Sequence, residues 1–514
     1  MPTECNPAQF EFPRLEGRAV VASFDGGRIT TDAGALLLGA ADRVIGLTRR
    51  FAACFRDARH APFVEHSVQT LVTQRVVGIA LGYEDLIDHD ELRHDPVLAV
   101  LAGKLSAGRA DCAPLAGKST LNRLERSRPE PTRYARIAAD PAAIEGLLVD
   151  LFLDAYATAP EQITLDLDAT DDPLHGHQEG RFFHGYYDSY CYLPLYVFCG
   201  RHLLAAKLRP ANIDAAAGAT EEIARIVGQI RTRWPGVRIL LRADSGFCRD
   251  ALMTWAEENR VDYVFGLARN TRLVDEITAE LQAACAEADV TGKPARRFKD
   301  FRWRTRESWS RERRVIGKAE WTQGEANPRF IVTSLAPAEV EATVAAKHLY
   351  ETIYRARGEM ENRIKECQLD LFADRTSSAT MRANQLRLWF SSLAYVLMRA
   401  APDRPRGDGI GQCHLRHDPA EAAQDRRAGA DQRAPGQRRH GLRLPVAGRV
   451  RTGPRRAEPS LRLSRYEPDT ASHSTGRSQT PFIRAAGQRR RITPQSPKQT
   501  GPAHPRHRPS CAPG

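Results

Sequence analysis

Several features are missing from this chain of 514 residues, and each absence argues against a class of protein. No apolar run approaches the ~20 residues that a membrane-spanning helix needs, and no charged segment followed by an apolar one opens the chain. The ten cysteines include no Cys-x-x-Cys pair, so neither a zinc module nor a disulfide framework is indicated. We therefore expect a cytoplasmic protein with reduced, mostly buried thiols and no membrane partner.

A net positive charge is missing from the first 400 residues. The whole chain carries +12, but residues 401–514 hold 23 Lys and Arg against 9 Asp and Glu, which leaves the remainder near −2. A basic chain normally indicates a nucleic-acid partner. Here that argument fails for the part of the chain that has regular apolar periodicity.

Residues 401–514 form an Arg/Pro-rich tail with almost no apolar pattern, for which two explanations stay open. One is a disordered basic tail. The other, which we favour, is a frameshift near Ala400. Back-translated residues 416–437, read one nucleotide later, can encode amphipathic and β-branched runs that the printed segment lacks. The nucleotide sequence would decide between the two.

A nucleotide cofactor is not expected. Residues 116–120 read Ala-Gly-Lys-Ser-Thr, like the end of a phosphate-binding loop, but Cys112 occupies the position of the first glycine and no apolar strand precedes it. His175, His177 and His184 lie in a Gly-rich stretch without a fourth ligand at a suitable spacing. They fit loop or DNA-facing histidines better than a zinc site.

Residues 1–155 are predicted to form a helical N-terminal domain without a diagnostic motif. Its amphipathic segments lie at 33–41, 65–82, 96–104, 119–126 and 141–157.

The pattern changes to strands after residue 160. Apolar residues at 163, 165 and 167 alternate with polar ones, so Asp166 and Asp168 share one face of a strand and Asp168 lies at its C-terminal end. This alternation does not show which of the two aspartates is the functional one. Further strands are expected at 190–199, 202–208, 237–241 and 263–267, with helices at 216–231 and 249–259. Asp244 follows directly after the strand at 237–241.

Residues 271–345 have a different sequence pattern and are predicted to be a β-rich insertion. An acidic helix near 275–288 precedes three basic and aromatic strands of a small sheet, at 297–304, 313–321 and 329–335. The order of elements predicts an α/β fold: a ribonuclease-H-like core in two parts, 156–270 and 346–400, interrupted by this insertion. Such sheets place ligands at the carboxyl ends of strands, where Asp168 and Asp244 fall.

A continuous helix over 346–371 would gather polar side chains on one side. At 100° per residue, an arc of about 80° holds Tyr354, Arg357, Glu361, Lys365 and Gln368. An adjacent apolar stripe holds Ile353, Met360, Ile364, Cys367 and Leu371. Glu361 is then the carboxylate beside Tyr354 and Arg357, whereas Glu359 and Glu366 point away from this arc.

These three acids suit phosphodiester chemistry. Two Mg²⁺ ions about 3.5–4 Å apart stabilise the attacking and leaving oxygens, and hard cations prefer carboxylate ligands. Asp168 would bridge the ions, and Asp244 and Glu361 would each hold one. Arg357 and its neighbours Tyr354 and Lys365 suit a DNA phosphate. The alternative is a set of ordinary solvated acids that cap strands and helices.

Four stretches carry a resemblance to a known family. Residues 165–173 (LDLDATDDP), 183–196 (FHGYYDSYCYLPLY), 242–247 (RADSGF) and 361–366 (ENRIKE) resemble a bacterial insertion-sequence transposase of the thirteen-eighty family. That family belongs to the DDE group with an insertion-sequence-four-like core. The similarity spans about residues 24–400.

The resemblance implies cut-and-paste DNA transposition on a ribonuclease-H-like core. It implies two Mg²⁺ ions, with Mn²⁺ as a substitute, and Asp168 rather than Asp166 as the first catalytic acid, with Asp244 and Glu361 completing the set. The implied partners are double-stranded DNA, as terminal inverted repeats and target, and a second copy of the chain in a homodimer. The N-terminal domain would bind DNA ends, and the bacterial protein would associate with the nucleoid when bound to DNA.

The related signature has Tyr, Arg and Glu at the spacing of Tyr354, Arg357 and Glu361, then a lysine seven residues after the glutamate. Here that position is Gln368, and Lys365, one turn earlier, is the candidate substitute.

In related transposases an aromatic residue of the β insertion stacks on a flipped base. Trp303, Trp309 and Trp321 are the candidates here. The alternative for each is a core or cross-strand partner.

Two other functions remain open: a structure-specific, metal-dependent nuclease, and a catalytically silent DNA-binding transposase remnant. Inverted repeats that flank the gene would separate a transposase from the nuclease. The altered tail predicts weak or absent transposition, restored when the offset frame is repaired.

Overall fold

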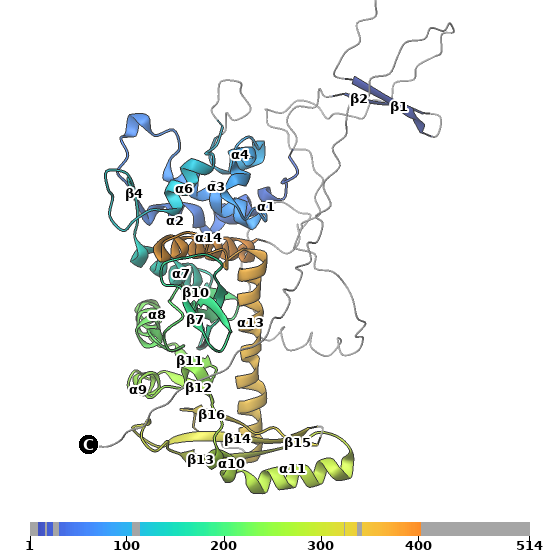
Figure 1. Cartoon of the computed structure of the whole chain (residues 1–514), viewed down its shortest axis with the longest axis vertical. Helices are drawn as coiled ribbons and strands as arrows, with labels where there is room; N and C mark the ends of the chain where they lie inside the picture. The colour runs from blue at the N-terminus through green and yellow to red at the C-terminus, as the bar shows by residue number, and fades with distance from the viewer. Residues whose placement is uncertain are drawn as a thin grey trace, which may run out of the picture. The chain divides into compact units, whose positions relative to one another are not determined.

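The computed structural model describes residues 9–15, 18–23, 30–104, 114–322, 324–336 and 342–401 (Figure 1). The predictions for the tail from residue 402 onward therefore lie outside the described residues. Strands β1 (Gln9–Leu15) and β2 (Arg18–Ser23) pair antiparallel and belong to a different compact unit from residues 25–456. The rest of the description concerns that larger unit.

Helices dominate the described residues up to 154. Side-chain caps start several of them, because Ser67, Asp95 and Asp140 each accept a backbone N–H from the first turn of the helix that follows. The helices are α1 (Ala35–Ile45), α2 (Leu47–Ala53), α3 (Val68–Ala80), α4 (His89–Leu92), α5 (Pro96–Leu101), α6 (Lys118–Glu125) and α7 (Pro141–Asp154). Short 3-10 turns η1 (Ala61–Phe63) and η2 (Leu86–Asp88) and the strand pair β3 (Phe55–Asp57) and β4 (Ile137–Ala139) lie between them.

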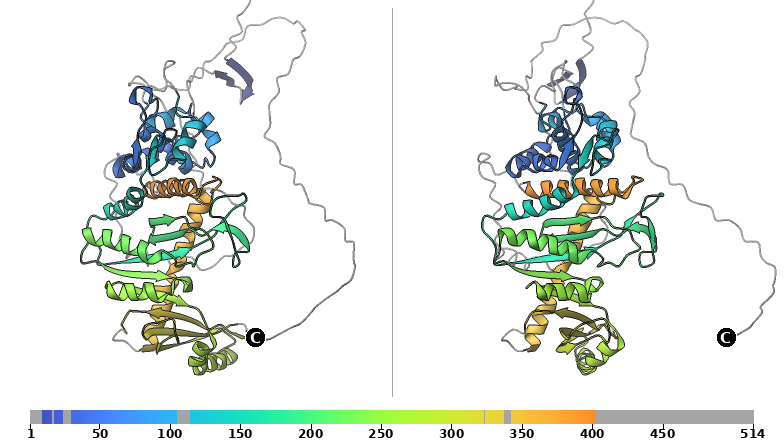
Figure 2. Two further views of the ribbon diagram at one scale, coloured as in Figure 1. Left: turned by 60° about the vertical axis from the view of Figure 1, so that its left-hand side comes forward. Right: turned by 90° about the vertical axis from the view of Figure 1, so that its left-hand side faces the viewer.

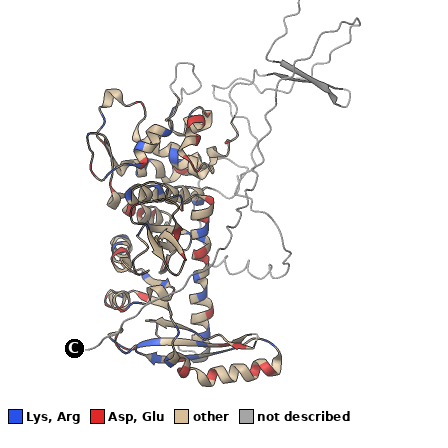
Figure 3. Cartoon of the chain, viewed as in Figure 1, with Lys and Arg blue, Asp and Glu red and all other residues tan. Residues whose placement is uncertain are grey.

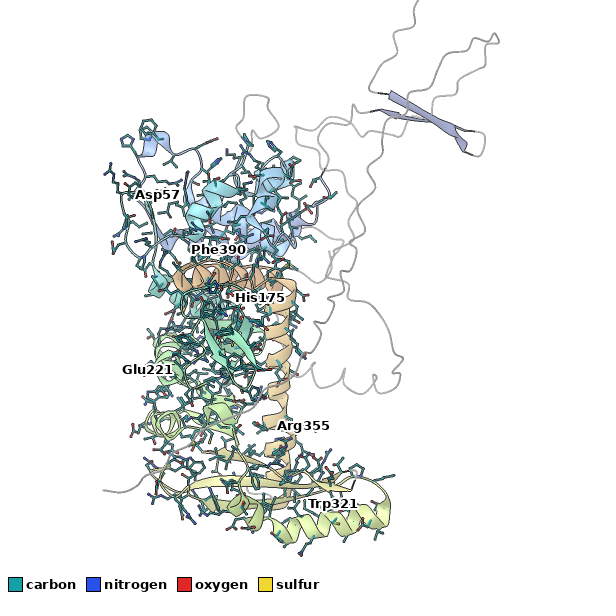
Figure 4. The ribbon with its side chains drawn as sticks, viewed as in Figure 1. Asp57, His175, Glu221, Trp321, Arg355 and Phe390 are labelled. Atoms are coloured by element: carbon teal, nitrogen blue, oxygen red, sulfur yellow. The ribbon has the colours of Figure 1, made fainter. Side chains whose placement is uncertain are left out.

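The last helix, α14 (Met381–Ala400), completes the core of these N-terminal helices (Figures 1 and 4). Phe390, labelled in Figure 4, packs edge-on against Phe51 with ring centroids 5.0 Å apart. A buried ion-pair network adds a polar link: Glu125 accepts from Arg75 at 2.7 Å and from Arg387 at 2.8 Å. The last described helix is thus packed onto the N-terminal helices of the larger unit.

One large mixed sheet forms the centre of the molecule. Its strand order is β10-β9-β5-β11-β12-β16-β14-β13, with β15 paired to β14. Strands β5, β11 and β12 are parallel, and the other pairs are antiparallel. The bounds are β5 (Gln162–Ala169), β9 (Leu195–Cys199), β10 (His202–Lys207), β11 (Arg238–Ala243), β12 (Asp262–Leu267), β13 (Ala295–Trp303), β14 (Arg313–Thr322), β15 (Glu325–Ala326) and β16 (Arg329–Thr333). The predicted α/β class is confirmed.

Alternation along the central strands sends two sets of side chains to opposite faces of the sheet. Ile163, Leu165 and Leu167 join the core formed with α7, α8 (Ala219–Arg233) and α9 (Asp250–Glu258). The helical segment 342–370 crosses the other face, from strands β13, β14 and β16 to α14 (Figures 1 and 2). Asp166 and Asp168 therefore face this segment.

The predicted small sheet within 271–345 is wrong. Strands β13, β14 and β16 continue the main sheet from β12, because Val264, Phe265 and their neighbours pair antiparallel with β16. Helices α10 (Thr271–Glu276) and α11 (Thr278–Thr291) precede these strands and replace the single predicted helix. We call β13, β14 and β16, together with the loop between β13 and β14, the sheet extension.

The predicted long strand over 190–199 is divided in two. Leu193-Pro194 ends β8 (Ser189–Tyr192) before β9 begins, since proline has no N–H for a ladder. Strand β8 instead lies between β6 (Asp172–Pro173) and β7 (Phe182–His184) in a separate three-stranded sheet. Neither β6 nor β7 was predicted.

The helix predicted over 346–371 is not one regular α-helix, although it runs on as a long rod (Figure 1). It consists of α12 (Ala342–His348), the π-helical turn η4 (Leu349–Tyr354), the 3-10 turn η5 (Arg355–Arg357), α13 (Gly358–Lys365) and the π-helical turn η6 (Glu366–Asp370). The uniform 100° spacing was therefore only approximate. Acidic and basic residues are interspersed along this rod (Figure 3).

Two further outcomes concern the described residues alone. None of the helices in these ranges is long and apolar enough to cross a membrane. Among the described thiols, Cys54, Cys191, Cys199 and Cys367 are buried, as predicted.

Candidate active site

Asp168 and Asp244 lie at the carboxyl ends of two neighbouring parallel strands. Strand β5 pairs with β11 in the register Arg242↔Asp166 and Ala243↔Leu167. Asp168 is the next residue of β5, and Asp244 follows directly after β11. The two side chains also interact electrostatically, because the charge of Asp244 acts to raise the pKa of Asp168. The two carboxylates therefore lie at the same edge of the sheet, where sheets of this kind bind their ligands.

The Asp-Ser-Gly-Phe motif holds Asp244 in a defined orientation. One carboxylate oxygen of Asp244 accepts the Gly246 N–H at 2.8 Å and so caps the 3-10 turn η3 (Ser245–Phe247). Phe247 at the end of this turn is fully buried in the core under the sheet. Local capping and core packing together fix the carboxylate.

Arg357 links the strand acid to the helix acid. Its guanidinium donates to Asp168 at 3.3 Å and to Glu361 at 2.9 Å. Burial opposes the charge of Arg357, but Asp168, Tyr354 and Glu361 outweigh it and raise the pKa of the guanidinium. Arg357 thus stays protonated between two acids that came from distant parts of the sequence.

The Asp168 carboxyl titrates far from its usual range. Burial raises its pKa from 3.8 to about 6, and the negative charges of Asp244 and Glu361 act in the same direction. Arg357 and the Ala169 N–H act against this rise. A cation placed among these acids would favour the ionised form.

Asp166 has a different environment, although it shares a face with Asp168. Its side chain is 3% exposed and accepts two hydrogen bonds from Arg242, at 2.5 and 2.8 Å. Burial raises the pKa of Asp166, and Arg242 lowers it. Arg242 also donates to the Ile353 carbonyl at 2.6 Å, so this pair ties β5 and β11 to the π-helical turn η4.

Tyr354 packs over a glycine of the next strand. A Cβ on Gly266 would lie 2.6 Å from the Tyr354 hydroxyl and 2.8 Å from the Ser245 backbone nitrogen. Only glycine fits this point of β12, where the tyrosine and the Asp244 turn approach the sheet. Burial and the Asp244 charge raise the pKa of Tyr354, and Arg357 lowers it.

Four polar side chains of the long helical rod have different environments. Glu361 and Lys365 are exposed on α13. Gln368 donates to the Asp171 carbonyl at 3.0 Å and so fastens η6 to the loop after β5. Glu366 pairs with Arg363 at 2.8 Å and also with Arg399 of α14. Glu366 is therefore part of a helix–helix contact and lies away from Asp168.

Two of the three predicted base-stacking tryptophans are buried. Trp303 is 6% exposed and Trp309 is 4% exposed, both within the apolar core of the sheet. The Arg272 guanidinium lies over the Trp303 ring, 4.5 Å from its centroid. Neither ring has a free face for a base. Trp321, at the end of β14 (Figure 4), is partly exposed and remains a candidate.

The donor set suits a divalent cation, although no ready-made metal cage is seen. Within the described ranges, no group of three or more His, Cys, Asp or Glu side chains converges as a metal site. Asp168, Asp244 and Glu361 supply hard carboxylate oxygens. Burial, and to a lesser extent the charges of Asp244 and Glu361, raises the pKa of Asp168, and a cation among these acids would favour its ionised form. Arg357 lies between two of these acids and would have to move aside.

Sequence analysis missed several residues that shape the site. Arg242, Gly266 and Phe247 hold Asp166, Tyr354 and Asp244 in place. Gly266 could have been noticed, because a glycine inside an apolar strand indicates close backbone approach. The Arg242–Asp166 pair could not, because it depends on the register between two strands 76 residues apart.

Comparisons with known proteins give a family for the chain. The family model described as "Transposase DDE domain group 1" matches residues 12–404. A cryo-EM structure of the piggyBac transposase synaptic complex with hairpin DNA is similar over 72% of this chain and 82% of that chain, with 11% identity and a TM-score of 0.32. No curated protein matches the sequence. Because the family model covers more than half of its length, the chain belongs to the DDE transposase family, domain group 1, and membership implies DNA transposition chemistry.

Proposed function

We propose that the chain is the transposase of a bacterial insertion sequence of the thirteen-eighty type, which cleaves and joins DNA at terminal inverted repeats. Asp168, Asp244 and Glu361 are its catalytic acids in this proposal, and Mg²⁺ its metal, with Mn²⁺ as a substitute. DDE transposases generally use divalent metals. The observation that carries the proposal is the link from Asp168 to Glu361 through Arg357, with Asp244 at the end of the neighbouring parallel strand.

The sheet supports a ribonuclease-H-like core. The run β10-β9-β5 is antiparallel, and β11 and β12 then add in parallel on the other side of β5. This is the strand arrangement of that core, in which the first and fourth strands end beside each other. Here those strands are β5 and β11, which carry Asp168 and Asp244. The segment 295–333 extends this core and does not form a module apart from it.

The residues of the chain would divide the work as follows. Divalent ions held by the three acids would stabilise the attacking and leaving oxygens of the phosphodiester. Arg357, released from Asp168 and Glu361, would bind a phosphate oxygen with its fork of donors. Tyr354 holds the rod against β12, and exposed Lys365 would add a point charge for the DNA backbone. Residues 1–155 are proposed to bind the DNA ends, and two chains to act as a homodimer.

Cleavage of a labelled duplex that carries the repeat from the flanks of the gene tests this proposal. Asp168→Asn, Asp244→Asn and Glu361→Gln should each lower the rate by at least about a hundredfold, because losing a metal ligand exceeds the 10–100-fold effect of outer-shell partners. Glu366→Gln is the matched control on the same rod, since Glu366 pairs with Arg363 and Arg399. Undiminished cleavage by the three acid variants would overturn the assignment.

A second candidate is a DNA-binding remnant that no longer cuts. The family match ends at residue 404, next to the change of composition near residue 400. This coincidence favours a C-terminal segment replaced by a frameshift. On this hypothesis the full chain binds the repeat without cutting it, and a version with the offset frame restored cuts. Cutting of structured DNA without repeats would instead indicate a nuclease.

A further inference from the structure

The hairpin of β7 and β8 exposes aromatic rings to solvent. These residues, called here the aromatic hairpin, span 181–190. Their exposed rings belong to Phe182, Phe183, Tyr186 and Tyr190. Single exposed apolar side chains are common on protein surfaces, whereas several large rings gathered within ten residues indicate an interaction site.

The turn of the aromatic hairpin lies beside the candidate active site. The Tyr187 hydroxyl donates to the carbonyl of Ala169, the residue after Asp168, at 3.4 Å. Burial raises the pKa of Tyr187 to about 12, and the charges of Asp171, Asp168 and Asp244 add to the rise. Tyr187 thus fastens the turn to the end of β5, within electrostatic reach of both strand acids.

Tyr186 presents its ring outward from this fastened turn. The side chain is 85% exposed, and its ring meets Tyr187 edge to face, with centroids 5.0 Å apart at 89°. The partly buried Tyr187 contacts Tyr186 at one edge, while solvent covers most of the Tyr186 ring. The backbone of the same turn is constrained, since Asp188 has φ of 49°. The ring of Tyr186 therefore projects into solvent from a turn that is attached to the end of β5.

A cation accompanies the rings of the aromatic hairpin. Phe183 pairs across the strands with Tyr190, with centroids 5.5 Å apart, and Arg181 lies over the Tyr190 ring at 3.8 Å. Aromatic faces interleaved with arginine are the surface on which nucleobases stack while the backbone phosphate meets a positive charge. A protein or lipid contact would not need the ring to be next to phosphodiester-cleaving acids.

We propose that Tyr186 is a stacking platform for an unpaired nucleobase of the DNA strand whose phosphate reaches Asp168 and Asp244. The ligand class rests on the proposed function. Bases inside a duplex are already stacked on their neighbours, so a protruding ring stacks most readily on a base that has left its pair. The platform lies in the aromatic hairpin, whereas Trp303 and Trp309 of the sheet extension are buried.

Binding of two fluorescent duplexes by the full chain tests the platform. One is fully paired, and the other has four unpaired nucleotides at its end; metal ions are omitted so that no cleavage occurs. Tyr186→Ala should lower the preference for the unpaired end about tenfold, the effect of one lost base–aromatic stack. Tyr186→Phe should keep the preference, because stacking needs the ring and not the hydroxyl.

Val290 on α11 provides a control outside the parts of the chain proposed to meet DNA. It is 86% exposed, close to the 85% of Tyr186, so both substitutions remove an accessible apolar side chain. Val290→Ala should leave the preference for the unpaired end unchanged. An equal loss in Val290→Ala would show that removing any exposed apolar side chain produces the effect, and the platform would be rejected.

The remaining outcomes separate this proposal from the proposed function. Full preference in Tyr186→Ala, or no preference in the unaltered protein, overturns the platform. A change of oligomeric state in Tyr186→Ala with unchanged preference assigns the ring to a second copy of the chain and also overturns it. Asp168→Asn should lose cleavage and keep the preference. If Asp168→Asn still cleaves DNA while the preference for the unpaired end depends on Tyr186, the proposed catalytic acids are rejected and the platform is retained.

Discussion

The sheet extension and the aromatic hairpin are both rich in aromatic and basic residues, yet they use them in opposite ways. In the extension, Trp303 and Trp309 are buried, and Arg313 donates to Asp250 at 2.6 Å and to Glu257 at 2.7 Å. In the hairpin, Tyr186 is exposed to solvent beside the acids. Composition alone therefore does not separate the two regions; the exposure of their rings and their distance from the candidate catalytic acids do.

Replacing an aromatic residue should affect the stability of the protein differently in the two regions. Trp303→Ala should lower the free energy of unfolding by about 3–5 kcal/mol, because it removes a large buried ring from the core. Tyr186→Ala should change it by less than about 0.5 kcal/mol, because the ring is largely in solvent. Denaturant unfolding measures both. Equal losses for the two variants would erase the distinction between the regions.

Replacing an arginine should also affect stability differently in the two regions. Arg313→Gln should cost about 3–5 kcal/mol, because it leaves Asp250 and Glu257 partly buried without their partner. Arg181→Gln should cost only about 0.5–1 kcal/mol, the size of a cation–π contact near the surface. Urea titrations of both variants test this order, and a more damaging Arg181→Gln would reverse it.

The acids of the two regions also differ. In the extension, burial raises the pKa of Glu320, but hydrogen bonds from Lys318 and Arg296 outweigh burial and lower it overall. Beside the hairpin, the pKa of Asp168 is raised to about 6. The fold therefore favours the protonated form of Asp168, a stabilisation present below pH 4 and lost as the pH rises through 6.

Asp168→Asn should consequently stabilise the protein at neutral pH. A rise of about two pKa units corresponds to about 3 kcal/mol, which an uncharged side chain would regain at pH 7.5. Near pH 4 the variant and the parent should unfold at similar denaturant concentrations. Thermal or urea unfolding at the two pH values checks this, and a destabilised variant at pH 7.5 would contradict the raised pKa.

Local patterns were enough to predict the parts of the fold that local physics determines. Alternation placed Asp166 and Asp168 on one face of β5, and Met360 and Ile364 of the predicted apolar stripe are buried, whereas Ile353 is partly buried. Family resemblance, rather than any pattern, favoured Asp168. The distinct environment of Asp166 comes from Arg242, which only the strand register brings beside it.

Long-range pairing decided the parts that were predicted wrongly. Nothing local shows that β16 adds to β12 and so makes the extension part of the main sheet. Nothing in a Trp–Arg pattern shows that Trp303 faces the core and not the solvent. Pro194 could have divided the predicted strand at 190–199, because proline cannot donate to a ladder.

Binding of Mn²⁺ to the full chain, followed by the electron paramagnetic resonance of the free ion, tests the central claim most directly. The account predicts two bound ions, with binding weakened at least about tenfold in Asp168→Asn and in Asp244→Asn, while Glu366→Gln binds like the parent. Equal binding by all four proteins would contradict a metal site built from Asp168, Asp244 and Glu361.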